Sequence, residues 1–379
     1  MPCTLTSLPV ELSTIIVDQV DSRDISSLRL TCSRLHSTTL YRFRQSFTHR
    51  TTNLSSKSLR ALTAVCEHED LGPAVRSLTV VAAYYDTTFL QKVLDTKRPY
   101  KKYNEEHGPV IRETHKLCTR KELNTVATQH NTLIRRQADQ AKVATSKSDL
   151  IQLTAIMQKA SNLRTITLEA GLYQYPEVRV AASQSRGAWA DVWKQALRVY
   201  SVTMTALAQS KLRIEELHIY GGEWGCSVPA YDMHRLMPDL LAKGLKEVLV
   251  QSRVLSLNYA TRLLEAERPF GVKGFQGYPR RIEESNTKLV SLAPDKRNYL
   301  GPAYFLSLCP NLQELDIGYY ALRIPEWCSS RDFSAYWGGY ENAFDQITRS
   351  VRLPKLLKCK IRGQSIRQHA LLQLLKDSP

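Results

Sequence analysis

The sequence lacks the marks of a secreted or membrane protein. No apolar run approaches the roughly 18 residues of a membrane helix, and no basic start followed by an apolar core marks a signal peptide. The eight cysteines are scattered and form no Cys-x-x-Cys pair, which argues against a disulfide framework and against a zinc site. We therefore expect free thiols, no bound metal, no membrane contact and a location in the cytoplasm, the nucleus or both.

Signatures of catalysis are also missing. The sequence has no Gly-x-Ser-x-Gly motif, no glycine-rich phosphate loop ahead of a helix and no His-Glu-x-x-His motif. Two adjacent carboxylate pairs, Glu105–Glu106 and Glu283–Glu284, lie in polar segments, where such pairs are normally solvated. The sequence therefore predicts a protein that is not an enzyme and that needs no cofactor.

What the sequence does have is an apolar helical pattern at its start. Between Leu8 and Phe47, three short helical patterns contain too few polar positions to cover their own apolar faces. A helical stretch that cannot bury its own apolar surface indicates one half of an interface. The alternative interpretation is an ordinary helical cap on a larger domain.

This stretch resembles an F-box, in the form common in filamentous fungi. The resemblance rests on the Leu-Pro-x-Glu-Leu opening at Leu8 and on the Asp-Ile pair at Asp24, and the segment that follows, to Val80, also resembles that family. The chain departs from the family at Val20, where leucine is usual. The resemblance implies docking to a Skp-type adaptor and, through it, to a cullin–RING ubiquitin ligase. It places the contact on seven apolar residues: Leu8, Pro9, Leu12, Ile16, Val20, Ile25 and Leu28.

The rest of the chain repeats a helix–strand pattern. The motif Leu-x-x-Leu-x-aliphatic, or a close variant, begins at Val75, Leu163, Ile214, Leu245, Leu312 and Leu356. Such units bury their apolar faces by stacking, with the strands in one parallel sheet and the helices behind it. The pattern resembles irregular leucine-rich repeats, although its copies begin 31 to 88 residues apart. We expect an α/β (α+β) fold, a horseshoe with long insertions; the alternative is a non-repeating α/β domain.

These patterns divide the chain into four parts. Residues 1–50 form the F-box-like part, 51–91 a linking helix (Thr51 to His68) and first strand, 92–147 a basic polar helical insertion, and 148–379 the repeat-like, substrate-binding domain. The insertion holds 13 Lys and Arg against 6 Asp and Glu, in a chain of net charge +16. Its basic and aromatic cluster at Lys97–Tyr103 could bind phosphates and stack on bases, but no nucleic-acid-binding motif accompanies it. From Val110 to Val143, where the insertion is polar with sparse apolar residues, we expect one or two solvated helices.

Aromatic residues mark two further segments. Trp189 and Trp193 stand four apart on an expected helix and are assigned to the core. The segment from Tyr319 to Tyr340 is rich in aromatics and follows an expected strand. Loops at the strand ends of a horseshoe often bind ligands, and Trp and Tyr are frequent hot-spot residues of protein interfaces. The candidate substrate contacts are therefore Trp327, Tyr336, Trp337 and Tyr340, unless these residues cap the core of the last repeats.

Together these patterns predict a substrate-receptor subunit of a Skp–cullin–F-box (SCF) type ubiquitin ligase, which recruits a protein substrate. Two alternatives stay open. One is a scaffold or interaction protein that delivers nothing to a ligase. The other is a nucleic-acid-binding protein that uses the basic insertion. A repeat surface recognises its partner by shape, so the sequence does not identify the substrate.

Overall fold

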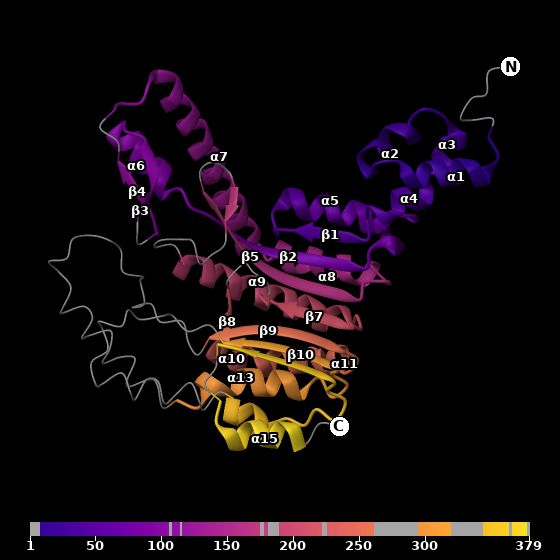
Figure 1. The fold of residues 1–379 in the computed structure, drawn as a ribbon, viewed down its shortest axis with the longest axis vertical. Helices are drawn as coiled ribbons and strands as arrows, with labels where there is room; N and C mark the ends of the chain where they lie inside the picture. The colour runs from indigo at the N-terminus through magenta and orange to yellow at the C-terminus, as the bar shows by residue number, and fades with distance from the viewer. Residues whose placement is uncertain are drawn as a thin grey trace.

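The chain folds into a mixed α/β structure around one large, mainly parallel sheet (Figure 1). The predicted fold class is confirmed at this level. A computed structural model describes residues 8–376 apart from 106–107, 114–115, 175–177, 181–188, 222–225, 261–294, 320–343 and 364–365.

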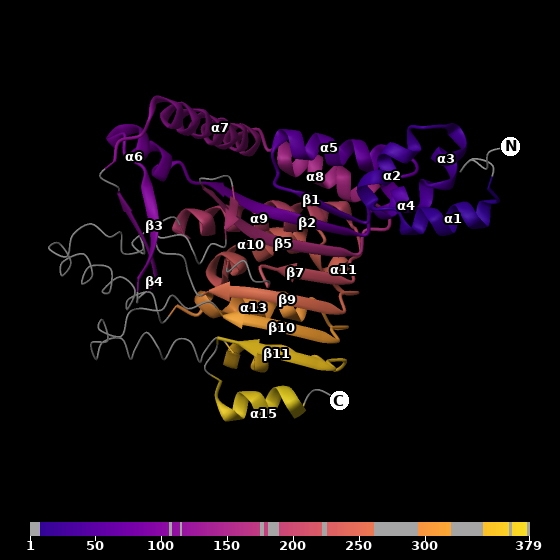
Figure 2. The ribbon, with the colours of Figure 1, turned by 45° about the horizontal axis from the view of Figure 1, so that its top comes forward.

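The N-terminal part is a lobe of four short helices that projects from one end of the sheet (Figures 1 and 2). Three helices were predicted, and the third pattern is divided at Thr39, whose hydroxyl donates to the carbonyl of Leu35 at 2.6 Å. Val17, Ile25 and Leu35 are the lobe's buried apolar residues. The helices are α1 (Val10–Gln19), α2 (Ser22–Arg29), α3 (Ser33–Thr38) and α4 (Leu40–Gln45).

The sheet adds its strands in chain order. Each main strand pairs in parallel with the next one, so every connection advances the chain by one strand position. Two short strands pair outside this path, β6 (Val178–Val180) on β5 and β8 (Val228–Pro229) on β9. The main strands are β1 (His49–Thr52), β2 (Ser77–Tyr85), β5 (Thr165–Gln174), β7 (Glu216–Ile219), β9 (Val254–Ala260), β10 (Glu314–Tyr319) and β11 (Lys358–Arg362).

Most helices form one layer behind the sheet, and successive helices contact one another (Figure 2). The strands alternate accordingly: Leu78 and Val80 are buried against the helices, while Ser77 and Thr79 are only half-buried. Trp193 is buried in the core, as predicted. The layer consists of α5 (Ser56–Glu67), α8 (Ser148–Lys159), α9 (Trp189–Ser210), α10 (Ala230–Ala242), α11 (Leu245–Leu249), α13 (Arg297–Ser307), residues 344–350 and α15 (Gln368–Lys376).

Two of the predicted elements were wrong. The fourth strand copy, at Leu245, is the helix α11, and the strand of that unit is β9. Leu245, Val248 and Leu249 are all buried, and a spacing of three suits a helix face as well as the repeat pattern. The expected helix over residues 51–68 begins later than predicted. Its first residues complete β1, and α5 begins after Ser55, whose side chain accepts a hydrogen bond from the Ser58 amide.

The basic insertion contains a helix where one or two were expected, but that helix is packed on the domain and a hairpin precedes it. It contains α6 (Thr88–Thr96), an antiparallel hairpin of β3 (Tyr100–Glu105) and β4 (Gly108–Glu113), and the long helix α7 (Arg120–Thr145). The basic cluster therefore begins the hairpin and does not belong to a helix. The helix α7 packs on α6 and β2, with a small core of its own formed by Val81, Ala83, Tyr85, Leu90, Val93, Val126 and Leu133.

Two glutamines explain why a polar helix packs beside β2. The β1 partner of β2 ends opposite Val80, so the later part of β2 has a free edge. Gln137 donates to the Tyr85 carbonyl at 2.6 Å and Gln140 donates to the Ala83 carbonyl at 3.0 Å. The side chains of α7 thus satisfy carbonyl groups that a neighbouring strand would otherwise pair.

Candidate functional site

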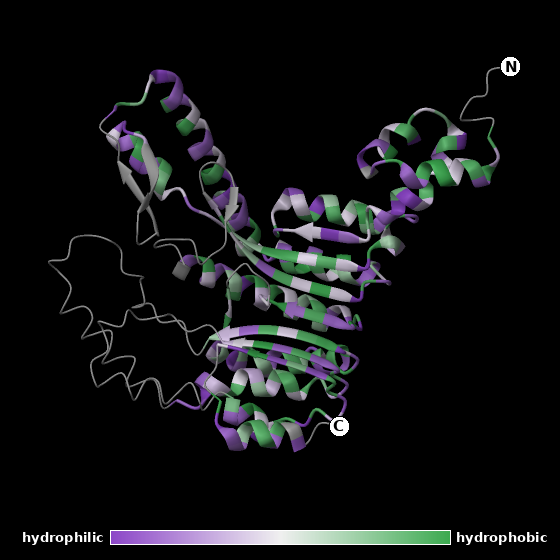
Figure 3. Cartoon of the chain, viewed as in Figure 1, coloured by the Kyte–Doolittle hydropathy of each residue, from purple (hydrophilic) through white to green (hydrophobic). Residues whose placement is uncertain are grey.

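The helix α1 presents an apolar side to solvent. Ser13 and Val17, four residues apart, face the lobe and are buried. The opposite side carries Leu12, Ile15 and Ile16, which are 49, 59 and 39% exposed, while Val10, the first residue of the helix, is 60% exposed. The spacing of three and four residues joins Leu12, Ile15 and Ile16 into one continuous strip. Figure 3 shows α1 as a largely hydrophobic helix at the outer end of the lobe.

Polar contacts inside the lobe fix the orientation of this strip. Arg34 of α3 donates to the Leu8 carbonyl at 2.7 Å, which holds the segment that enters α1. Asp21 caps α2 by accepting from the Arg23 amide at 2.8 Å. At the far end of α1, the Tyr41 hydroxyl donates to Asp18, and burial together with that carboxylate raises the pKa of Tyr41 to about 12.

The seven predicted adaptor residues divide into three groups. Pro9, Leu12 and Ile16 are exposed, while Leu8, Val20 and Leu28 are half-buried. Ile25 is only 2% exposed and belongs to the core of the lobe, so its prediction as a direct contact does not fit this structure. Ile15, which lies in the exposed strip, was not among the predicted contacts. Its signal in the sequence is the helical spacing that places it beside Leu12 and Ile16.

The open face of the sheet is the second candidate surface. Its register aligns half-exposed polar side chains in rows across the strands, because alternate residues point away from the helix layer. One row, polar except at Val254, runs from Thr165 through Glu216, Val254 and Glu314 to Lys358. These side chains pair across strands: Thr165 donates to Glu216 at 3.2 Å, and Lys358 contacts Glu314 at 3.0 Å.

At the carboxyl ends of the strands, Arg362 links four chain segments. Its guanidinium donates to Asp316 of β10 at 2.8 Å, to the Asn258 side-chain oxygen of β9 at 3.1 Å and to the Gly221 carbonyl at 3.2 Å. Asn258 in turn donates to the Tyr220 carbonyl at the end of β7. This arginine network therefore binds β7, β9, β10 and β11 together where the long insertions leave the sheet.

Two glycines leave the space that the arginine network and its neighbours occupy. A Cβ atom at Gly318 would lie 2.1 Å from the Asn258 side-chain oxygen, and one at Gly221 would lie 1.7 Å from the Ser256 hydroxyl oxygen. Tyr220 has φ of 55°, a left-handed conformation that is uncommon outside glycine. Its hydroxyl donates to the Ala196 carbonyl at 2.8 Å, which helps to hold that conformation.

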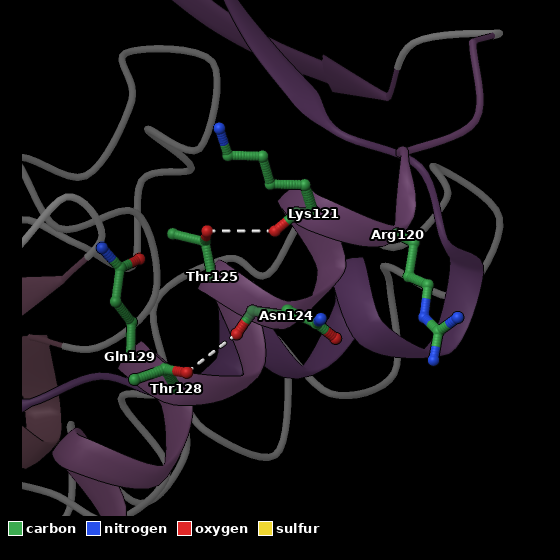
Figure 4. A pocket seen from close by; sticks show the side chains of 6 residues that line it. All are labelled: Arg120, Lys121, Asn124, Thr125, Thr128 and Gln129. Carbon is green, nitrogen blue, oxygen red and sulfur yellow. Dashed lines mark hydrogen bonds between the residues drawn. The ribbon is translucent and has the colours of Figure 1, made fainter.

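A shallow hollow of ≈ 690 Å³ lies beside the start of α7 (Figure 4). All six lining residues come from the first three turns of this helix. Two of its hydroxyls donate back to the helix, Thr125 to the Lys121 carbonyl at 3.0 Å and Thr128 to the Asn124 carbonyl at 2.9 Å. This arrangement offers hydrogen bonds and positive charge on an open surface. The lining residues are Arg120, Lys121, Asn124, Thr125, Thr128 and Gln129.

The predicted substrate contacts lie in parts of the chain that the structure does not describe. Trp327, Tyr336, Trp337 and Tyr340 lie outside the described residues, and so does the side chain of Trp189. In the ranges that the structure describes, no group of three His, Cys, Asp or Glu side chains could hold a metal ion. Among the same residues, every helix is too short or too polar to cross a membrane.

Comparison with protein families and with curated proteins adds no relative. No protein-family model matches this chain, and no curated protein matches it significantly. The F-box-like and repeat-like interpretations therefore rest on the sequence patterns.

Proposed function

We propose that the chain is a non-catalytic substrate receptor of an SCF-type ubiquitin ligase. The observation that carries this proposal is the exposed apolar strip of α1. A helical lobe with no partner gains nothing from leaving Leu12, Ile15 and Ile16 in water, whereas a docking surface requires such a strip. It also coincides with the start of the sequence pattern that resembles an F-box. Leu8, Leu12 and Ile16 are therefore the proposed centre of the contact with a Skp-type adaptor.

The sheet supports the receptor half of the proposal. Parallel strands that add in chain order, with helices behind them, are what irregular leucine-rich repeats form, and such sheets expose one face to partners. The lobe lies at the β1 end, so a protein held by the open face would be carried near the ligase without any chemistry from this chain. The proposed mechanism is proximity, which raises the effective concentration of substrate lysines at the charged enzyme.

The decisive test charges the apolar strip. In the variant Leu12→Asp/Ile16→Asp, two exposed side chains become carboxylates, which should cost little folding free energy. Covering each aliphatic side chain is worth roughly 1 kcal/mol, and burying a carboxylate costs more. We expect adaptor binding about 100-fold weaker or lost, as measured by co-purification and by titration with a labelled Skp-type adaptor.

The matched control moves the same change to other exposed aliphatic residues. Ile151 on α8 and Leu241 on α10 are 66 and 41% exposed, and Ile151→Asp/Leu241→Asp should bind the adaptor as the parent does. Equal adaptor binding by all three proteins would remove the basis of the proposal. Circular dichroism confirms that each variant is folded before its binding is compared.

The two alternatives give different results. A scaffold that binds the adaptor but delivers nothing would co-purify with the adaptor, yet cullin and ubiquitylated clients would be absent. A nucleic-acid binder would use the basic insertion, where Arg120 and Lys121 line the hollow beside α7. Its binding would weaken steeply as salt rises and would be lost when the basic residues of 97–102 are neutralised.

A further inference from the structure

The C-terminal segment is a second concentration of positive charge. Residues 344–376 contain eight Lys and Arg but one acidic residue, Asp345. This segment therefore carries an excess of seven positive charges, the same as the basic insertion. It builds the last part of the sheet: the helical residues 344–350, the strand β11 and the helix α15.

Few carboxylates balance these cations. Asp316 of β10 is shared by Arg362 at 2.8 Å and Lys360 at 3.9 Å. Behind the sheet, the buried Asp345 faces Arg367 at 2.9 Å, His369 at 3.5 Å and Arg349 at 3.9 Å. Glu314 of β10 also faces Lys358, at 3.0 Å. Because these three carboxylates stand against eight Lys and Arg of the segment, the surface around β11 keeps a net positive charge that an anionic partner could neutralise.

The strand β11 is also the last strand of the sheet. In the described ranges it pairs with β10 alone, and Lys358, Cys359 and Lys360 are all exposed. The free edge of β2, in contrast, is satisfied by Gln137 and Gln140 of α7. The edge of β11 thus offers backbone groups for an added strand, bordered by two lysine side chains that are 72 and 64% exposed.

The register of the last two strands specifies the sequence that would fit. Glu314 lies opposite Lys358, and Asp316 lies opposite Lys360, so acids on β10 alternate with bases on β11. Opposite charges at facing positions stabilise neighbouring strands. We propose that the free edge of β11 binds an extended acidic peptide segment by strand addition, with Asp or Glu at alternate positions facing Lys358 and Lys360.

A peptide fits this edge better than a nucleic acid does. The rings of residues 344–376 do not suit base stacking at this edge, because Phe344 is buried and the exposed ring of His369 faces Asp345 behind the sheet. Leu357, which precedes the strand, is 77% exposed and suits an aliphatic side chain of a peptide. Edge lysines also prevent self-association of sheets, but that role alone requires no affinity for an acidic strand. The edge lies at the other end of the sheet from the helical lobe, so the proposal does not depend on adaptor docking.

The test uses the full chain and a fluorescein-labelled decapeptide of alternating Glu and Val, with binding followed by anisotropy. We expect saturable binding that Lys358→Glu/Lys360→Glu weakens about tenfold or more, because both facing charges are reversed. The matched control, Lys57→Glu/Arg60→Glu, makes the same change in net charge on the exposed side of α5, far from β11 in the sheet order. It should bind within about twofold of the parent.

Two further probes separate the binding modes. N-methyl groups on alternate residues block hydrogen bonds along one side of a peptide strand, so one of the two N-methylated series should lose binding while the other keeps it. Equal binding by both series would overturn strand addition. A single-stranded decanucleotide is the second probe. If it bound more tightly than the peptide, and if Lys358→Glu/Lys360→Glu weakened that binding, the edge would be a nucleic-acid site and the proposal of a peptide ligand would be wrong. Equal peptide binding by the parent and Lys358→Glu/Lys360→Glu would overturn the site itself.

Discussion

At the scale of single residues, Arg362 is the side chain on which the open face depends most. Its guanidinium donates to Asp316, Asn258 and the Gly221 carbonyl, and Asn258 is buried. We expect Arg362→Ala to lower the free energy of unfolding by about 1–3 kcal/mol, because it leaves the Asn258 oxygen without its donor. Urea unfolding measures the change.

The control for that prediction is Lys360→Ala on the same strand. Lys360 approaches the same carboxylate, at 3.9 Å, but its side chain is well exposed. Its loss should change the unfolding free energy by no more than about 0.5 kcal/mol. Equal losses in the two variants would show that the arginine network adds no stability beyond a surface charge pair. The sequence could not predict this network, because Gly221 and Arg362 are 141 residues apart and meet only through the strand order.

At the scale of elements, helix α7 decides whether the basic insertion is a folded part of the domain. Leu133 is 1% exposed in the small core beneath α7, whereas its neighbour Ile134 is 42% exposed. We expect Leu133→Ala to cost about 2–4 kcal/mol and Ile134→Ala less than about 1 kcal/mol. Urea unfolding gives the two values, and trypsin cleavage at Arg135 reports local opening of the helix. A solvated helix, as the sequence suggested, would show the same small loss in both variants.

The elements that the sequence predicted well are those with one strong periodicity. The strand pattern that begins at Leu312 became β10 because its alternation leaves Leu315 and Ile317 buried and Asp316 half-exposed. The pattern at Leu245 failed because three-residue spacing is shared by a helix. The polarity of α7 concealed its packing, since Gln137 and Gln140 reach backbone carbonyls of β2 that no local pattern reveals.

At the proposed adaptor surface, spacing could separate exposed Leu12 from buried Val17, but it did not reveal that Ile25 is a core residue.

At the scale of the whole molecule, the sheet places two distinct surfaces at its two ends. The helix α1 with its apolar strip projects beyond β1, and the basic edge of β11 lies at the other end. Residues 148–343, which build the middle of the sheet, are nearly balanced in charge, with 22 Lys and Arg against 20 Asp and Glu. The chain's large positive charge is therefore concentrated in the basic insertion and the C-terminal segment, and the middle of the sheet contributes little to it.

The buried thiols make the stability of the whole fold sensitive to alkaline pH. Burial raises the pKa of Cys66 to about 11 and the pKa values of Cys226 and Cys309 to about 12, from an ordinary value of 9.0. Above pH 9 the unfolded chain releases these protons while the folded chain retains them, so stability falls as the pH rises from 9 toward 12. Each fully buried thiol contributes a slope of up to about 1.4 kcal/mol per pH unit. Urea midpoints at pH 7, 8, 9 and 10, in reducing buffer, should therefore decline from pH 9 upward.

The variant Cys226→Ala/Cys309→Ala isolates the contribution of the thiols from that of buried tyrosines such as Tyr200 and Tyr259, whose pKa values burial also raises. Between pH 7 and 8 the two proteins should differ by a constant amount, since none of these groups ionises there in either state. Above pH 9 the variant should lose stability less steeply than the parent, because its unfolded chain has two fewer thiols to ionise. Parallel curves up to pH 10 would mean that the two thiols are solvated in the folded chain, which contradicts their burial between the sheet and its helices.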